Sequence, residues 1–208
     1  MLKMTIYSYI ITRDYGFAPN PFYGICTLAT CKPRVRNNAQ IGDWVLGFGS
    51  GRKGSNYKDK LIFAMKVYKK ITFDEYWQDP KYESKKPVAN GSLKQNYGDN
   101  IYHKINNVWV QENSHHSMDN GEVNIKNLER DTKSQYVLLG KEFWYFGKEA
   151  VSLPDNLKFL IPKGRDYTKH NADEEDILAW LNREYPEKGY LGEPDKFSLG
   201  NFERYKGE

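Results

Sequence analysis

Residues 42–48 read GDWVLGF, a Gly-Asp turn followed by a short apolar run, and residues 61–67 read LIFAMKV. Both runs are rich in aromatic, aliphatic and β-branched side chains and are bounded by glycine or polar residues, which is typical of buried strands. The same composition recurs in residues 4–12 (MTIYSYIIT), 24–30 (GICTLAT), 136–140 (YVLLG) and 142–146 (EFWYF). These runs predict a mixed β-sheet at the centre of the fold.

Helices are expected to be few. Residues 72–75 (TFDE) have the form of a capping box, and Asp79-Pro80 ends the short helix that they begin. Residues 172–185 (ADEEDILAWLNREY) begin with acidic side chains, which favour a helix N-terminus, and place Ile177 and Leu181 on one face. The predicted fold class is therefore α+β, a curved or barrel-like mixed β-sheet with a few flanking helices.

A long polar stretch, residues 82–131, interrupts the pattern of strands. It is rich in Asn, Gly, Lys and Ser, and a structureless loop of that length is unusual inside a compact domain. Residues 100–103 and 108–111 are its better-ordered pieces, so we interpret the stretch as an excursion that carries a binding surface. Residues 1–165 are expected to form one β-rich domain, and residues 166–208 a helix and tail packed on it.

The composition excludes some classes of protein. The 208 residues include 31 Lys and Arg against 27 Asp and Glu, a formal net charge of +4 that permits an anionic partner without requiring one. A mean hydropathy of −0.80 and the lack of a long apolar run argue against a membrane-spanning helix. The apolar stretch near the N-terminus is too short, and is followed too early by polar residues, for a secretory signal. We therefore expect a cytoplasmic protein with reduced thiols at Cys26 and Cys31.

A glycine-rich stretch, residues 47–54 (GFGSGRKG), contains the pattern G-x-G-x-x-G. A dinucleotide site would need a helix directly after it, and here a strand follows, while the P-loop spacing is also missing. The remaining interpretations are a hairpin whose Ser50, Arg52 and Lys53 contact a phosphate, and a flexible exposed hairpin without a ligand.

The loop at residues 16–23 (GFAPNPFY) sets two prolines around Asn20. Prolines lower the entropy of ordering a loop, which suits a preorganised pocket wall. Asn20 is then a candidate for hydrogen bonding a base edge, with Phe17 or Phe22 stacked on the ring, and Trp44 is a further stacking candidate. A rigid turn packed on its own aromatic side chains is the alternative.

The basic segment at residues 32–36 (KPRVR) alternates charged and apolar side chains. In an extended conformation Lys32, Arg34 and Arg36 share one face, which can follow phosphate groups. A solvated edge without a partner explains the pattern as well.

Three of the four histidines, His103, His115 and His116, lie within the polar excursion. Histidine titrates near neutral pH, so His103 or His116 is a candidate general acid or base. Further candidates surround them: Asp99 and Tyr102 for a catalytic role, Trp109 and Gln111 for ligand binding. The alternative is a set of surface histidines on a mobile loop.

No metal or other cofactor is predicted. Cys26 and Cys31 are separated by four residues rather than the two of a zinc knuckle, and a zinc site that joins them to His103 and His116 is the weaker interpretation. Basic neighbours of Cys31 favour a lowered thiol pKa. Because the sequence reveals no oriented base beside it, Cys31 is not predicted to be a nucleophile.

Several ordered segments together resemble the nucleotide modification associated domain 2 family. They are GFAPNPFYGICTLATCKPRVR (16–36), IGDWVLGFGS (41–50), LIFAMKV (61–67), FDEYW (73–77), GDNIYH (98–103), WVQ (109–111) and SHHS (114–117). The resemblance implies a role in phage or bacterial systems that modify or handle DNA bases, or in defence. The Gly-Asp turn before Trp44 is also similar to that of PUA, EVE and ASCH domains, which are small barrels that bind nucleic acid.

Three functions are compatible with these observations. The first is a binding module for a nucleotide or modified nucleobase, with DNA favoured over RNA and no membrane partner. The second is an enzyme that acts on a nucleotide or base, with His103, His116 or Asp99 exchanging protons and Tyr102 orienting them. The third is a subunit that binds a protein partner, for which an exposed apolar patch around residues 143–146 would be the sign.

Overall fold

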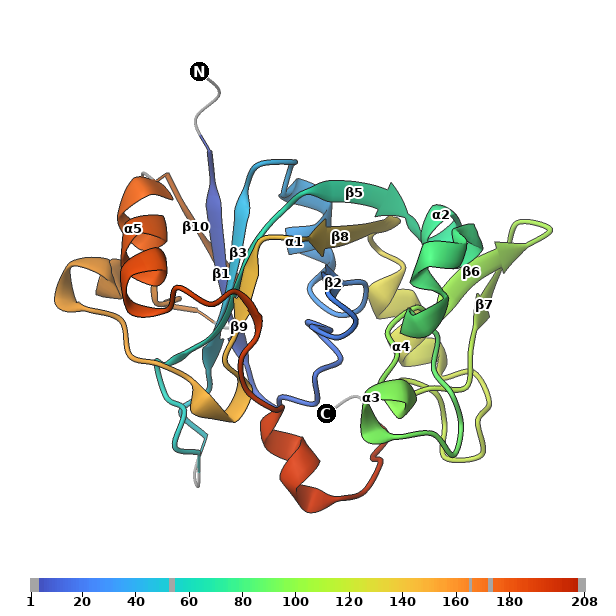
Figure 1. Ribbon diagram of the computed structural model, residues 1–208. Helices are drawn as coiled ribbons and strands as arrows, with labels where there is room; N and C mark the ends of the chain where they lie inside the picture. Colours follow the sequence, from blue (N-terminus) through green and yellow to red (C-terminus); the bar gives the residue numbers. More distant parts are fainter. Residues whose placement is uncertain (1–3, 53–54, 165, 172–173, 206–208) are drawn as a thin grey trace.

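The computed structural model describes residues 4–52, 55–164, 166–171 and 174–205 (Figure 1). Lys53 and Gly54 of the glycine-rich stretch lie outside the described residues, as do Ala172 and Asp173, where the C-terminal helix was expected to begin. No helix within the described ranges has both the length and the apolar character needed to cross a membrane.

The largest sheet contains six strands in the order β10-β1-β3-β4-β9-β11. Strands β1 and β3 are parallel neighbours, so the chain between them must cross over instead of turning back as a hairpin. This crossover carries β2 into a second sheet, of order β2-β8-β5, and a third sheet is the hairpin of β6 and β7. The strands are β1 (Ile6–Ile11), β2 (Cys26–Leu28), β3 (Trp44–Gly49), β4 (Leu61–Lys66), β5 (Lys69–Thr72), β6 (Tyr102–Ile105), β7 (Val108–Gln111), β8 (Tyr136–Gly140), β9 (Phe143–Tyr145), β10 (Tyr167–His170) and β11 (Gly189–Tyr190).

Each apolar run that predicted a strand contains one, which confirms the mixed sheet and the α+β class. The barrel is not confirmed, because the described strands form three separate sheets and none of them closes. The run at 143–146 is β9 with its following residue and is at most 3% exposed, so it belongs to the core and forms no apolar patch.

The helices are short apart from the last one. Thr72 and Glu75 form the expected capping box at the start of α2 (Phe73–Gln78). Helix α5 (Glu174–Glu184) packs Ile177 and Leu181 against the face of the large sheet that carries Trp44. The other helices are α1 (Pro33–Asn38), α3 (Leu93–Asn96) and α4 (Ile125–Asp131), with 3₁₀ helices at Pro80–Lys85, Gly147–Glu149, Asp155–Leu160 and Asp195–Leu199.

The polar excursion is ordered and lies beside β5 and β8, away from the large sheet (Figure 1). Its two expected pieces form the β6–β7 hairpin. Asn106 and Asn107 turn this hairpin with φ values of 51° and 64°, a left-handed conformation that asparagine tolerates better than most residues. The hairpin and α4 thereby bring the histidine-bearing residues 112–124 toward the junction of β2 and α1.

The basic segment at 32–36 is helical, which corrects the expected extended face. Pro33 occupies the first turn of α1, where its missing N–H is not needed. Arg36 is fully buried and donates to the backbone carbonyls of Cys31, Ser134, Tyr136 and Asp131. It is therefore a structural link between α1 and the segment before β8, and it is not available to a phosphate.

Replacing Arg36 with Met should destabilise the protein strongly, because four buried carbonyl groups lose their donor. We expect the free energy of unfolding, measured by urea denaturation, to fall by about 3 kcal/mol or more. Arg34→Met on the same helix is the matched control, since the Arg34 side chain is 72% exposed and should change the value by less than about 0.5 kcal/mol. Equal effects of the two substitutions would contradict this assignment of Arg36.

Candidate functional site

A cavity of about 690 Å³ lies between strand β1 and the polar excursion. One wall comes from β1 and the residues that follow it, including Tyr9, Arg13 and Phe17. The opposite wall comes from Cys31 and Lys32, from His116, and from Tyr205 in the C-terminal segment. The cavity therefore collects residues that lie far apart in the sequence.

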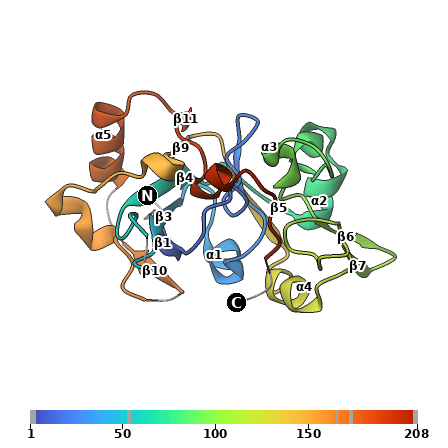
Figure 2. The ribbon, with the colours of Figure 1, turned by 90° about the horizontal axis from the view of Figure 1, so that it is seen from below.

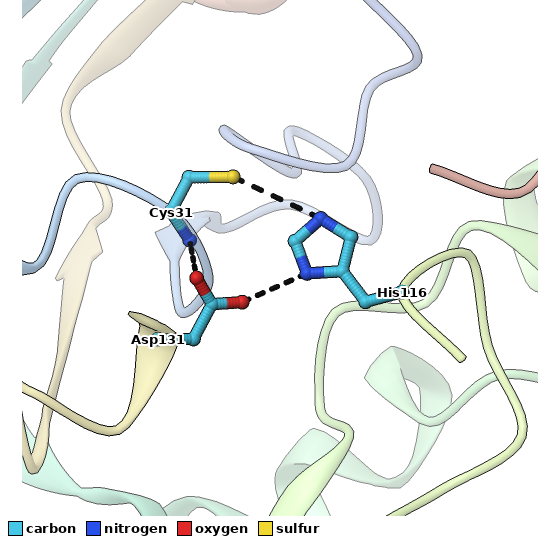
Figure 3. Close-up of side chains that lie close together, drawn as sticks. All are labelled: Cys31, His116 and Asp131. Atoms are coloured by element: carbon cyan, nitrogen blue, oxygen red, sulfur yellow. Dashed lines mark hydrogen bonds and ion pairs between the residues drawn. The ribbon is translucent and has the colours of Figure 1, made fainter. Parts of the chain in front are cut away.

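Cys31 and His116 line this cavity, and Asp131 is buried behind them. The three side chains come from three different segments (Figure 3). Cys31 lies between β2 and α1, His116 lies in the loop between β7 and α4, and Asp131 is the last residue of α4. The Cys31 Sγ is 3.8 Å from His116 Nε2, and His116 Nδ1 is 2.8 Å from Asp131 Oδ2. Thiol, imidazole and carboxylate thus form a chain in which the carboxylate orients the ring toward the sulfur.

Asp131 has no solvent exposure, and its carboxylate accepts four hydrogen bonds. Oδ1 accepts from the backbone N–H of Cys31 at 3.0 Å and from Arg130 Nε at 2.9 Å. Oδ2 accepts from His116 Nδ1 and, at 3.0 Å, from the Tyr102 hydroxyl. Because the carboxylate engages Nδ1–H of His116, Nε2 is the ring nitrogen that faces the sulfur.

The charges in this cluster shift the pKa of each member. Burial alone would lower the pKa of His116, but the charges of Asp131 and Cys31 outweigh it and raise this pKa to about 9. Burial raises the pKa of Cys31, yet the neighbouring His116 lowers it below the ordinary thiol value overall. The charges of His116 and Arg130 likewise overcome burial and hold the pKa of Asp131 well below its usual range. These directions favour a thiolate paired with an imidazolium at neutral pH.

The backbone at Cys31 is unusual. Cys31 and Lys32 have φ values of 55° and 39°, so two consecutive non-glycine residues adopt the left-handed conformation. Such residues cost free energy and are concentrated at functional sites. Here the conformation places the sulfur at the cavity and directs the Cys31 N–H to Asp131.

Among the described residues, these three are the one group of metal-ligating side chains whose ligand atoms all lie within 4.8 Å of one another. Their arrangement does not fit a zinc ion well. Asp131 is hydrogen bonded to the ring nitrogen opposite the one that faces the sulfur, and both of its oxygens are already occupied. A metal between Sγ and Nε2 would receive two protein ligands from this cluster, fewer than the three or four of known zinc sites.

The rim of the cavity is cationic. Arg13, Lys32 and Arg130 line it, against the single acidic residue Asp166. Asp166 is itself paired with Arg34 at 2.8 Å, so the cationic groups outnumber the acids at the rim. This arrangement suits an anionic ligand.

The inner wall is aromatic and contains an unpaired hydroxyl. Tyr9, Tyr15, Phe17 and Tyr205 line the cavity. The Tyr9 ring is 1% exposed, and its hydroxyl is buried without a hydrogen-bond partner. Because buried polar atoms are almost always paired, this hydroxyl is a candidate contact for a group bound in the cavity.

The C-terminal segment closes the site on the side of the histidines. It runs from the 3₁₀ helix at Asp195–Leu199 toward α4 (Figure 2). The backbone N–H of Tyr205 donates to the His115 carbonyl, and His115 Nδ1 donates to the Glu203 carbonyl. Burial, together with the charge of His116, lowers the pKa of His115 to about 3, so His115 is a neutral support for the loop.

The structure brings some of the predicted site residues to this cavity. Phe17, Ser50 and His116 line it. Tyr102 and Gln111 lie one layer behind, where Gln111 Nε2 donates to the Tyr102 hydroxyl and Tyr102 donates to Asp131. Arg52 lines a neighbouring polar cavity that shares Ser50.

Other predicted site residues lie outside this cavity. His103 stacks on Trp77 with the ring centroids 4.1 Å apart, and Trp109 packs edge-on against Phe73. Neither lines the cavity around Cys31. Arg34 is exposed and paired with Asp166. Phe22 lines a separate cavity beside Tyr190.

A third group of predicted residues is buried and already paired. Asn20 donates to the Tyr97 carbonyl and accepts from Lys85 Nζ. Asp99 accepts from the hydroxyls of Thr27 and Tyr76. Trp44 is fully buried in the core, and Arg36 is fully buried among backbone carbonyls. The polar groups of this set are used for folding.

The sequence around Cys31, Asp131 and Tyr9 does not mark these three as site residues. The basic residues after Cys31 and the histidine pair at 115–116 were the available signals. The pairing of Cys31 with Asp131 spans 100 residues and leaves no local pattern.

Nuclear magnetic resonance of the histidine ring nitrogens tests the electrostatics of the cluster. We expect His116 to be doubly protonated at pH 7 and to titrate near pH 9, while His115 stays neutral at pH 7. In Asp131→Asn the pKa of His116 should fall by at least about one unit, because a buried negative charge is lost. A His116 that titrates near pH 6.5, its ordinary value, would contradict the ion pair.

Comparison with known proteins gives one result. The family model described as nucleotide modification associated domain 2 matches residues 3–201 of the 208. A search of curated proteins found no match, and neither did a search of solved structures. Because the match covers nearly the whole chain, the protein belongs to the nucleotide modification associated domain 2 family.

Proposed function

We propose that the cavity around Cys31 binds a nucleotide or a modified nucleobase. The observation that carries the proposal is the combination, in one cavity, of a cationic rim and an aromatic inner wall. The volume of about 690 Å³ lies within the range of roughly 300–1,000 Å³ found for small-molecule sites. The family match, which indicates a role associated with nucleotide modification, supports the same ligand class.

The phosphate end of the ligand is assigned to the rim. Arg13 is exposed beside the cavity, and Arg130 carries its guanidinium above the Tyr205 ring, 5.2 Å from the ring centroid. Guanidinium groups bind phosphate through paired N–H donors. Lys32 adds a third cation, with its Nζ 4.8 Å from the centroid of the Tyr9 ring.

The base end is assigned to the aromatic wall. Aromatic rings offer stacking surfaces worth about 1–3 kcal/mol per base. The unpaired Tyr9 hydroxyl is a donor that a carbonyl or ring nitrogen of a base can accept. A cavity of this size takes one nucleotide, either free or turned out of a DNA strand.

A catalytic role is the second candidate, and one observation favours it: Cys31 and His116 line this cavity, and the buried Asp131 holds the His116 ring from behind. Any proton transfer is assigned to His116 in place of His103, which lies outside the cavity. The partner-subunit function has no comparable support, because residues 143–146 are buried.

Calorimetric titration with the four deoxynucleoside 5′-monophosphates, their nucleosides and a single-stranded oligodeoxynucleotide tests the ligand class. We expect at least one monophosphate to bind with a Kd on the order of micromolar, and its nucleoside to bind at least about tenfold more weakly. Tight binding of the oligonucleotide alone would assign the site to a nucleotide within DNA. No binding by any of these probes would contradict the proposal.

Arg13→Gln tests the phosphate contact. It should weaken binding of the monophosphate by roughly fivefold, about 1 kcal/mol, and leave binding of the nucleoside unchanged. Arg183→Gln is the matched control, because Arg183 is 70% exposed on α5 and outside the cavity lining. Equal affinity of Arg13→Gln and the control would remove Arg13 from the site.

A further inference from the structure

The cavity contains a thiol that lies beside an oriented imidazole. Among the described residues Cys31 is the cysteine that lines it, while Cys26 is fully buried in the core. The sulfur lies 3.8 Å from His116 Nε2, and the ring is fixed from behind by Asp131. A nucleophile next to a base that a third group orients is the arrangement of covalent catalysis.

The left-handed backbone at Cys31 and Lys32 strengthens this interpretation. A thiol that served only for packing would not need two strained residues, whereas here they hold the sulfur toward the imidazole. The Cys31 N–H is also used, since it donates to the same carboxylate that orients His116. Sulfur and ring are therefore positioned by one common group.

We propose that Cys31 is the nucleophile of an acyl-transfer reaction, in which its sulfur attacks the carbonyl carbon of an amide or ester carried by a nucleotide. His116 is the proton carrier and Asp131 is a positioning residue. The identity of the substrate as a nucleotide derivative rests on the proposed function, whereas the covalent step rests on the cluster itself.

The atoms of the step balance with water as the second reactant. The Cys31 thiolate forms an S–C bond to the carbonyl carbon, and the C–N or C–O bond breaks as the leaving group takes the proton from His116 Nε2. Water then gives a proton to Nε2 while its oxygen attacks the thioester carbon. The S–C bond breaks with its electron pair returning to sulfur, which releases a carboxylic acid and restores the thiolate–imidazolium pair.

The unpaired Tyr9 hydroxyl fits the first half of this step. Attack on a carbonyl leaves a negative oxygen that needs a donor in a water-poor site. Tyr9 lines the same cavity as Cys31, and its hydroxyl donates to no protein group among the described residues. We assign this hydroxyl to the carbonyl oxygen of the substrate, beside the cation of Lys32.

Alkylation by iodoacetamide measures the state of the Cys31 sulfur without any nucleotide. The charged and titratable groups around it are His116 in the 112–124 loop, Asp131 and Arg130 on α4, Lys32 and Arg36 at α1, Tyr9 on β1 and Tyr102 on β6. We expect the alkylation rate of Cys31 to rise by clearly less than about tenfold per pH unit between pH 6 and 8, because the imidazolium beside the sulfur lowers the thiol pKa. The alkylation rate of an ordinary thiol rises close to tenfold per pH unit as long as the pH is below the thiol pKa of about 8.5.

His116→Gln should lower the rate at pH 6 by at least about tenfold and restore the ordinary pH dependence. His103→Gln is the matched control, since it replaces a histidine outside the cavity, and it should behave as wild type. Mass spectrometry locates the label at Cys31, and Cys31→Ala should take up none. A wild-type rate that rises tenfold per pH unit would overturn the thiolate–imidazolium pair even if His116→Gln failed to fold.

Acylation by p-nitrophenyl acetate tests the transfer step. We expect wild type to release a burst of one equivalent of p-nitrophenolate and to gain an acetyl group on Cys31. In Cys31→Ser, where Tyr9 is unchanged, the burst should be at least about a hundredfold slower. A reactive thiolate that takes up no acetyl group would overturn the acyl-transfer assignment. Saturable loss of alkylation on adding zinc chloride, together with no acylation, would assign the cluster to a metal instead.

These outcomes are independent of nucleotide binding. Failure of every nucleotide to bind, with alkylation and acylation as expected, would retain the nucleophile and remove the nucleotide as its substrate. Binding of a nucleotide with an unreactive Cys31 would retain the proposed function and remove the inference.

Discussion

The buried carboxylate of Asp131 is the constraint on which the site depends. A charge without solvent exposure is tolerated only when its partners are complete, because desolvating an ion costs several kcal/mol. The partners of Asp131 come from the β2–α1 junction, the loop after β7, strand β6 and α4 itself. Satisfying this one group therefore fixes how the polar excursion lies against the segment that carries Cys31.

The rest of the fold supports that arrangement from both sides. Arg36 donates to the carbonyls of Cys31 and Asp131, so it ties the backbones of the nucleophile and the carboxylate together. On the other side, Asn127 Nδ2 bonds to the His116 and Tyr205 carbonyls and attaches the C-terminal segment to the histidine loop. Catalytic geometry on loops needs such a second layer, because loops by themselves are mobile.

The strands and the α2 capping box could be predicted because their signals are local, as in the apolar runs around Trp44 and Phe63. Local composition did not reveal which polar residues would be buried. Asn20 and Asp99 look like ligand contacts in sequence. In the fold, Asn20 hydrogen bonds to Tyr97, and Asp99 accepts hydrogen bonds from Thr27 and Tyr76. The pattern of histidines indicated His116 as a candidate, but the partners of His116 lie 85 residues away in the sequence at Cys31 and 15 residues away at Asp131. The basic segment was misassigned because Pro33 starts a helix there, which turns Arg36 inward.

The ultraviolet absorbance of the thiolate, measured as a pH titration of wild type minus Cys31→Ser, tests the central claim most directly. This difference isolates one sulfur, since Cys26 is present in both proteins and burial raises its thiol pKa far above neutral. We predict a thiolate band of one sulfur whose titration midpoint lies below the ordinary thiol pKa of about 8.5. A band that appears only above about pH 8, as for an isolated thiol, would contradict the account.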